Sequence, residues 1–184
     1  QENGLQLTSI LITHHHPDHV GGIPALLKQR EIPVYGPARE TIPAMTHPLA
    51  EGDVIQPAGL DISLRVMEVP GHTLGHIAFH NAELNWLFCG DTLFNAGAGN
   101  CHGGGHPEEL YHTFATQLAK LGDGTLVYPG HDYIGNNLGF TLDREPDNEK
   151  ARVLLSEVHD QNPNAALVST LALEKEINTF FRLH

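Results

Sequence analysis

The sequence is short of positive charge: it has 10 Lys and Arg residues against 22 Asp and Glu, which gives a formal net charge of −12 with His neutral. A chain this acidic is a poor binder of phosphate backbones, so nucleic acid is not an expected partner. No apolar run approaches the length that spans a bilayer, and no signal peptide is visible. A membrane is therefore not an expected partner either.

Cysteine is also scarce. The two cysteines, Cys89 and Cys101, do not form a close pair, and two thiols cannot build a disulfide framework. A reducing compartment, the cytoplasm, is therefore the expected location. The sequence contains no Gly-x-Ser-x-Gly motif, so it gives no support to a serine hydrolase.

The length of 184 residues allows one domain with a sizeable core, or one domain with a small appendage. Residues 61–69 alternate, with Ile62, Leu64 and Val66 on one face, which predicts a half-buried strand. Residues 107–121 carry apolar residues at spacings of three and four, which predicts an amphipathic helix. Beyond residue 134 we expect helices that break near Pro146 and Pro163, followed by a last short helix over 171–177.

Four times in the sequence, a short apolar strand runs into a residue of a type that binds metals: His14, His72, Asp91 and His131. Functional groups often lie on loops held by a rigid sheet, so this recurrence predicts a shared site. The stretch around the first of them, residues 13–19, reads THHHPDH. Its imidazoles and carboxylate suit a divalent metal such as zinc.

The candidate ligands are too many for one tetrahedral zinc ion but suit two metals that share a carboxylate. Two-metal sites have spacings of about 3.5–4 Å, which a carboxylate can bridge and an imidazole cannot, and this singles out Asp91. A shared water molecule would ionise near neutral pH, which implies hydrolysis of an ester, thioester, amide or phosphoester. The candidates are His14, His16, Asp18, His19, His72, Asp91 and His131.

The same motifs resemble those of the metallo-β-lactamase superfamily. Within it, the sequence is most similar to the glyoxalase II (hydroxyacylglutathione hydrolase) family, and the resemblance covers nearly the whole chain. The matching segments are residues 13–19, Pro70 to His76, Gly90 to Phe94, Gly130 to Tyr133 with Asn136-Asn137, and Ser169 to Leu171 with Asn178 to Arg182.

The resemblance implies an α/β fold, the αββα metallo-β-lactamase sandwich, lacking the usual first strands and followed by a short C-terminal helical part. It implies a catalytic domain over residues 1–142. Residues 143–184 would form a helical region that contributes to substrate binding.

The resemblance also implies two divalent metal ions, with zinc in first place and iron or manganese as alternatives. Asp91 would bridge them and act in catalysis together with Asp18. His15 and His76 match family positions that are not ligands. The ligand groups would be His14, His16 and His72 for one metal, and Asp18, His19 and His131 for the other.

The implied substrate is a small-molecule thioester, S-lactoylglutathione or a related glutathione thioester. A metal-bridging hydroxide would attack the thioester carbonyl and release lactate and glutathione. Tyr133 and Arg182 match residues that contact the glutathione part. Asn100 and His102 stand where the family usually places a basic and then an aromatic residue, so these two are further candidates for substrate binding.

Gln1 lies only thirteen positions before His14, a shorter lead than the family has. This suggests either a trimmed piece or a sandwich completed in an unusual way, for example by another copy, so a homo-oligomer is left open. Three other functions compete with the thioesterase. They are a mononuclear iron persulfide dioxygenase, a generalist lactonase or esterase of the same superfamily, and a metal-poor fragment without activity.

Overall fold

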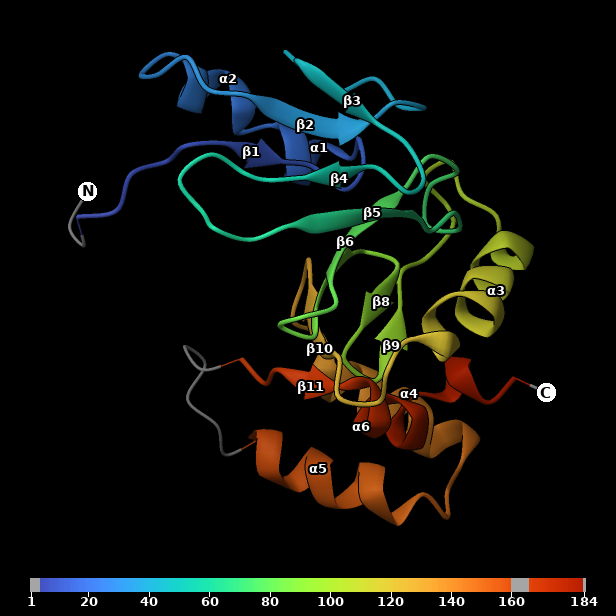
Figure 1. Ribbon diagram of the computed structural model, residues 1–184. Helices are drawn as coiled ribbons and strands as arrows, with labels where there is room; N and C mark the ends of the chain where they lie inside the picture. The colour runs from blue at the N-terminus through green and yellow to red at the C-terminus, as the bar shows by residue number, and fades with distance from the viewer. Residues whose placement is uncertain (1–3, 160–165, 184) are drawn as a thin grey trace.

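The computed structural model describes residues 4–159 and 166–183 of the chain. Two β-sheets lie face to face, and helices cover their outer faces (Figure 1). The first sheet is parallel, with the order β1 (Ile10–Leu11), β2 (Val34–Pro37) and β3 (His47–Leu49). Two short helices, α1 (Pro17–Val20) and α2 (Ile23–Leu27), pack on it through a cluster that includes Val20, Ile23 and Val34.

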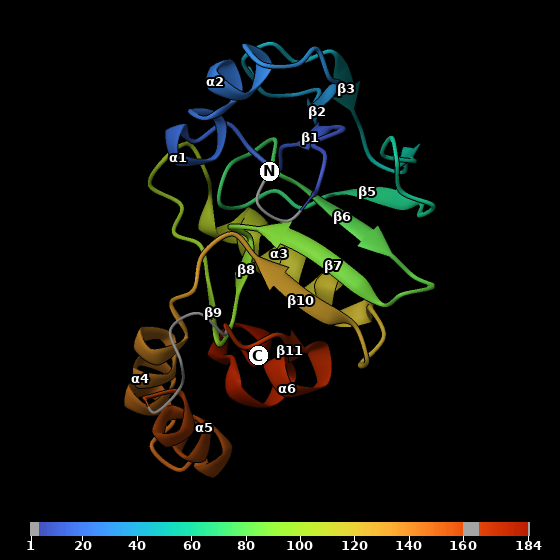
Figure 2. The same cartoon turned by 90° about the vertical axis from the view of Figure 1, so that its left-hand side faces the viewer.

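The second sheet has six strands in the order β11-β10-β7-β6-β5-β4. Figure 2 shows β6, β7 and β10 side by side, with helix α3 (Pro107–Thr116) behind them. The strands are β4 (Val54–Ile55), β5 (Leu64–Glu68), β6 (Ile77–Asn81), β7 (Trp86–Gly90), β10 (Leu126–Pro129) and β11 (Ser169–Thr170).

Apolar residues on the two faces of β5 and β6 pack into two separate hydrophobic cores. Leu64, Val66 and Phe79 face the first sheet and join the core between the sheets. Ala78, from the opposite face, joins the core under α3 together with Phe114. The layers are thus helix, sheet, sheet, helix, which confirms the predicted αββα sandwich.

The helical part near the C-terminus packs against the loop that follows β7. It contains α4 (Ile134–Arg144), α5 (Glu149–His159), α6 (Leu171–Ile177) and the 3₁₀ turn η2 (Thr179–Phe181). Its core includes Leu138 and Ile177, together with Ala96 from the hairpin of β8 (Leu93–Phe94) and β9 (Gly97–Ala98). The division after residue 142, predicted from the resemblance, falls near the end of α4 and stays a prediction.

The strand predicted over 61–69 is confirmed as the shorter β5, and the helix over 171–177 is confirmed. The predicted helix over 107–121 was too long, because α3 ends at Thr116 and the chain continues as the 3₁₀ turn η1 (Leu118–Lys120). Leu118 still reaches the same core from that turn. The predicted break at Pro163 lies outside the described residues, within which no helix is long and apolar enough to cross a membrane.

Candidate metal centre

The ends of four strands meet at one edge of the sandwich and bring the predicted ligands together. His14 follows β1, His72 follows β5, Asp91 follows β7 and His131 follows β10. The polar side chains form three overlapping groups, in each of which one nitrogen or oxygen atom per residue lies within 4.8 Å of the others. The groups are His14 with His16 and His72, His14 with His19 and Asp91, and Asp18 with His19 and His131.

Hydrogen bonds to the loop after β9 orient the imidazoles of His72 and His16. His72 donates through Nδ1 to the carbonyl of Asn100 (2.6 Å), and His16 donates through Nε2 to the carbonyl of Gly103 (2.9 Å). The remaining nitrogens, His72 Nε2 and His16 Nδ1, face each other at 2.9 Å. In neutral rings both of these nitrogens carry lone pairs and no proton, so the pair is suited to hold a cation between them.

Two buried atoms at the centre of the cluster point to the same need. Among the described residues, His14 Nε2 and Asp91 Oδ1 are buried without a hydrogen-bond partner. Buried polar atoms are nearly always paired, and an unpaired one is costly. A nitrogen and an oxygen left free beside other imidazoles are donors that suit a divalent metal, so these residues fit a metal centre.

Asp91 lies between the two sets of imidazoles. Its Oδ1 is 3.3 Å from His19 Nε2, and its Oδ2 is 3.5 Å from His72 Nε2 and 3.4 Å from His131 Nε2. Gly130 leaves room for this carboxylate, since a Cβ atom there would collide with Asp91 Oδ1. One carboxylate therefore faces both sets of imidazoles.

Burial sets the protonation of this cluster. Burial, followed by the neighbouring imidazoles of His76 and His19, lowers the pKa of His14. Burial also lowers the pKa of His72. These imidazoles are neutral at pH 7, the form that binds a metal. The interaction with the Asp91 carboxylate instead raises the pKa of His19.

Asp18 lies at the open side of the cluster, with its side chain 59% exposed and its Oδ2 3.2 Å from His131 Nε2. Burial would raise the pKa of Asp18. A hydrogen bond with its own backbone and the imidazoles of His19 and His131 outweigh that effect, so the pKa is lowered. Asp18 is therefore ionised at neutral pH.

The residues predicted to bind substrate lie in different places. Tyr133 is half-exposed and its ring is stacked beside that of His131, with centroids 5.3 Å apart. A hollow of about 330 Å³ opens next to it, lined by Tyr133, Asn136 and Val158 among others. Tyr133 thus stands between a predicted ligand and open space.

The other three candidates are held differently. Asn100 offers its backbone carbonyl to His72, and its side chain accepts from the backbone N–H of the exposed His102 (3.0 Å). Arg182 forms a two-point ion pair with Glu145 and also donates to the Lys175 carbonyl (2.7 Å). No hydrogen bond of Arg182 in the described part of the chain reaches the metal cluster. The substrate roles of these residues stay predictions.

Sequence reasoning missed the groups that orient the ligands. The carbonyls of Asn100 and Gly103 belong to the backbone and have no signature in the sequence beyond the run of glycines around them. Gly103 itself is needed because a Cβ there would lie 2.5 Å from His16 Nε2. Glu40, which contacts His15 and Thr73, was also missed because it lies far from every recognised motif.

Two family models match the chain, one after the other. The model described as the metallo-beta-lactamase superfamily matches residues 1–131, and the one described as the hydroxyacylglutathione hydrolase C-terminus matches residues 132–184. A Nitrosococcus oceani protein named hydroxyacylglutathione hydrolase is 55% identical over 186 residues, covering 100% of this chain and 70% of that protein. One of the same name from Polaromonas is 50% identical, covering 98% and 69%.

Solved structures share the fold. The crystal structure of ETHE1 from Myxococcus xanthus superposes with a TM-score of 0.71 at 26% identity, covering 96% of this chain and 64% of that one. TTHA1623 in a di-iron-bound form superposes with a TM-score of 0.65 at 28% identity, covering 97% of this chain and 79% of that one. The match thus extends over almost the entire chain in both cases.

Proposed function

Because the chain belongs to the hydroxyacylglutathione hydrolase family of the metallo-β-lactamase superfamily, we propose that it hydrolyses hydroxyacyl thioesters of glutathione, such as S-lactoylglutathione. In this reaction water adds to the thioester carbonyl and the carbon–sulfur bond breaks. The hydroxyl group stays on the acyl carbon and a proton goes to the sulfur, so the products are a hydroxy acid and glutathione.

The observation that carries this proposal is the double set of ligands around Asp91. One set is centred on His14, His16 and His72, and the other on Asp18, His19 and His131. A centre for a single metal would need only one of them. The second set therefore favours a two-metal hydrolase over a mononuclear iron dioxygenase.

We propose that these two sets hold two divalent ions, zinc in first place with iron or manganese as alternatives, and that Asp91 is shared between the ions. Ions bound there supply Lewis acidity toward a carbonyl oxygen and lower the pKa of a water molecule toward neutrality. The acceptor carbonyls of Asn100 and Gly103 hold His72 and His16 in the tautomers that leave Nε2 and Nδ1 free.

The side chains at the open side of the cluster have separate tasks in this proposal. The ionised carboxylate of Asp18 orients the attacking water by accepting a hydrogen bond from it. Tyr133 lies over His131 and presents a half-exposed aromatic face to the glutathione part of the substrate. Asn100, His102 and Arg182 remain candidates for further contacts with that part.

The proposal places the protein in the cytoplasm, because glutathione is kept as a free thiol in that compartment. The partner is then a small-molecule thioester. The net charge of −12 speaks against nucleic acid as a partner, and self-association is left open.

Hydrolysis of S-lactoylglutathione by metal-replete protein tests the proposal, with loss of the thioester absorbance as the readout and metal content measured in parallel. We expect turnover that a chelator abolishes and that added Zn²⁺ restores. Protein that holds two metals and shows no turnover would contradict the glutathione thioester as substrate. Protein that holds one iron and consumes oxygen with a persulfide would instead support the dioxygenase.

A further inference from the structure

We propose that Glu40 is a positioning residue for the metal centre, which clamps together the two loops that carry His14, His16 and His72. This inference rests on the proposed metal-dependent function, although its main readout is metal binding and not turnover. Glu40 follows β2 in a turn closed by a hydrogen bond from its backbone N–H to the carbonyl of Pro37 (3.1 Å). It lies outside every metal-binding motif of the sequence.

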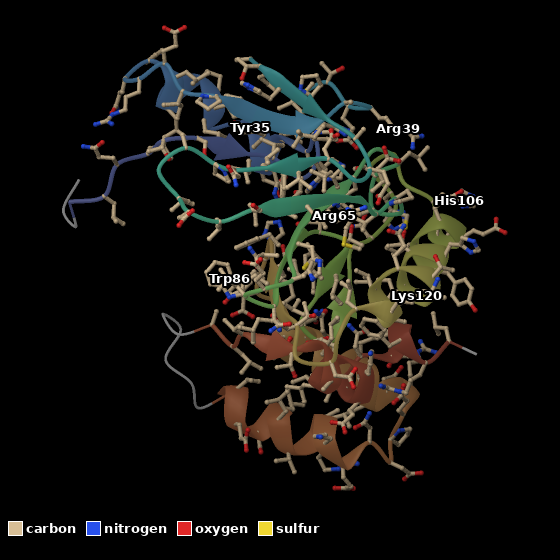
Figure 3. All side chains as sticks on the ribbon, in the orientation of Figure 1. Tyr35, Arg39, Arg65, Trp86, His106 and Lys120 are labelled. Carbon is tan, nitrogen blue, oxygen red and sulfur yellow. The ribbon has the colours of Figure 1, made fainter. Side chains whose placement is uncertain are left out.

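Glu40 turns inward where its neighbour turns outward. Arg39, labelled in Figure 3, has a side chain that is 60% exposed and that donates to Glu68 at the surface (3.4 Å). The Glu40 side chain is only 4% exposed. A carboxylate is rarely buried unless its oxygens are used, so its partners explain its position.

The two oxygens of Glu40 contact two different loops. Oε2 accepts from Nδ1 of His15 (2.9 Å), which stands between the ligands at positions 14 and 16. Oε1 accepts from the hydroxyl of Thr73 (2.5 Å), the residue after His72, and from the backbone N–H of Gly75 (3.2 Å). One carboxylate thus bonds to the neighbours of all three ligands.

The close packing of Gly75 supports this arrangement. A Cβ atom at Gly75 would lie 2.5 Å from Cγ of Glu40, so the loop has room for the Glu40 side chain only because residue 75 is glycine. The same two loops are joined at their base by a hydrogen bond from the Ile77 N–H to the Thr13 carbonyl (2.9 Å). Glu40 adds the second point of attachment, near the ligands.

A clamp at this place sets the spacing of the ligands themselves. His16 Nδ1 and His72 Nε2 come from the two loops and lie 2.9 Å apart. A metal requires its ligands within a few tenths of an ångström of fixed distances, so separation of the loops weakens binding. Residues that orient ligands through hydrogen bonds change metal affinity by roughly 10–100-fold when they are removed.

The test measures Co²⁺ binding by metal-free protein in competition with a chromophoric chelator, together with the visible absorption of the bound Co²⁺. We expect Glu40→Ala to weaken Co²⁺ binding by about 10–100-fold and to change the absorption bands. Glu40→Gln keeps a carbonyl oxygen for Thr73 and Gly75, so we expect it to recover most of the affinity. His15→Ala should weaken binding less, because the His15 side chain is 41% exposed.

Asn81→Ala is the matched control for general destabilisation. Asn81 is also buried and ties two segments, by donating to the Ser63 carbonyl (2.8 Å) and accepting from the Leu84 N–H (2.7 Å). It lies at the end of β6 that is remote from the metal loops. We expect Asn81→Ala to lower Tm while the Co²⁺ affinity and spectrum stay unchanged.

Two outcomes would overturn the proposal: Glu40→Ala with the affinity and spectrum of the parent protein, or an equal loss of affinity in Asn81→Ala. Additivity is a second check. If His15 acts through Glu40, the double variant should bind Co²⁺ no more weakly than Glu40→Ala alone. Neither readout uses a thioester. A parent protein that fails to hydrolyse S-lactoylglutathione would refute the proposed substrate, and the Co²⁺ affinity and spectrum would still test the role of Glu40.

Discussion

The imidazole of His76 is stacked on that of His14, with ring centroids 4.6 Å apart and planes inclined by 20°. Its Nε2 accepts from the backbone N–H of Asp91 (3.2 Å), and its Nδ1 lies 3.2 Å from the hydroxyl of Thr92, which donates to the Val69 carbonyl. These partners fix a neutral ring with its proton on Nδ1. Burial lowers the pKa of His76 and so keeps the ring neutral. The ring therefore supports two predicted ligands, His14 by stacking and Asp91 by accepting from its backbone N–H.

Replacing His76 with Phe should keep a flat ring in place while leaving the Asp91 N–H without an acceptor. A buried N–H without a partner costs about 1–3 kcal/mol, which corresponds to a fall in Tm of roughly 3–10 °C. We also expect bound metal to fall, measured by elemental analysis. His80→Phe, on strand β6 just after His76 but away from the cluster, should retain its metal. A His76→Phe protein with unchanged Tm and metal content would show that the ring has no supporting role.

The metal-free protein should lose stability in mild acid. The pKa values of His14, His72 and His76 are lowered in the folded state, chiefly by burial. In the unfolded chain each of these imidazoles has a pKa of 6.5, so below that pH the unfolded state binds more protons than the folded state. The free energy of unfolding then falls as the pH drops through that value, by up to about 1.4 kcal/mol per pH unit for each such imidazole. Burial lowers the pKa of His80 in the same way, so the raised pKa of His19 opposes the combined effect of four imidazoles.

Thermal unfolding of chelator-treated protein between about pH 7 and pH 5 measures this effect. We expect Tm to fall steadily with pH, and to fall less steeply in His76→Phe, which lacks one of the buried imidazoles. A Tm that does not change over this range would contradict the neutral state of the cluster.

Asp91→Ala removes the carboxylate that faces both sets of imidazoles. We expect this variant to lose metal and activity together, with turnover reduced more than about 100-fold, because even residues one step from a ligand change affinity by 10–100-fold. Asp123→Ala is the control, since Asp123 is an exposed aspartate paired with Lys175 (2.6 Å). An Asp91→Ala protein that kept both metals and full turnover would refute the bridging role.

How far the site could be predicted depended on whether its chemistry lies in side chains. His14, Asp91 and His131 each follow a short apolar strand, and that local pattern was enough to predict that they meet. The carbonyls of Asn100 and Gly103 could not be found in this way, because every residue has a carbonyl and only the fold brings these two to the imidazoles.

The fold shows the same limit. Alternation in β5 was visible because Leu64 and Val66 are buried and Arg65 between them is exposed. The end of α3 was not, since the apolar stripe continues to Leu118 and Leu121 although the backbone changes to a 3₁₀ turn after Gln117. Glu40 is the corresponding case in the site, since its partners His15 and Thr73 are 25 and 33 residues away.

Glu174 connects the C-terminal helices to the hairpin beside the site. Its carboxylate is fully buried and accepts from the Ala96 N–H (2.9 Å) and from Asn178 Nδ2 (3.1 Å). Ala96 has a positive φ of 56°, an uncommon conformation for this residue, and this hydrogen bond helps to hold it. On the same hairpin, Phe94 packs edge-on against Tyr133, with ring centroids 5.4 Å apart.

We expect Glu174→Ala to lower the free energy of unfolding by about 3 kcal/mol or more, because it leaves several buried donors without an acceptor. Glu174→Gln keeps one acceptor oxygen, so its free energy of unfolding should lie between those of the parent protein and Glu174→Ala. Burial raises the pKa of Glu174 above its unfolded value of 4.5. The contribution of Glu174 to stability is therefore fully present below pH 4.5 and is lost as the pH rises through the pKa that Glu174 has in the folded state. Denaturant titrations across this range should show that loss in the parent protein and not in Glu174→Gln.

Arg182 has two candidate roles that one pair of variants can separate. It forms a two-point ion pair with Glu145, which ties the end of the chain to the C-terminal end of α4. The resemblance predicts in addition that it binds the substrate. Burial would raise the pKa of Glu145, but hydrogen bonds from Asn148 and Arg182 outweigh it and the pKa is lowered. The stability from this pair is therefore present above pH 4.5 and is lost as the pH falls through the folded value.

Arg182→Gln and Glu145→Gln both break the ion pair, so both should lower Tm at neutral pH by a few degrees, for a partly exposed pair of about 1 kcal/mol. The two variants should differ in their kinetics only if Arg182 also binds the substrate. If Arg182 also contacts the anionic part of the thioester, KM for S-lactoylglutathione should rise about tenfold in Arg182→Gln and stay unchanged in Glu145→Gln, and this is the result we expect. Equal KM values in the two variants would restrict Arg182 to holding the C-terminal helices together, and the cation for the substrate would then have to be sought among other residues.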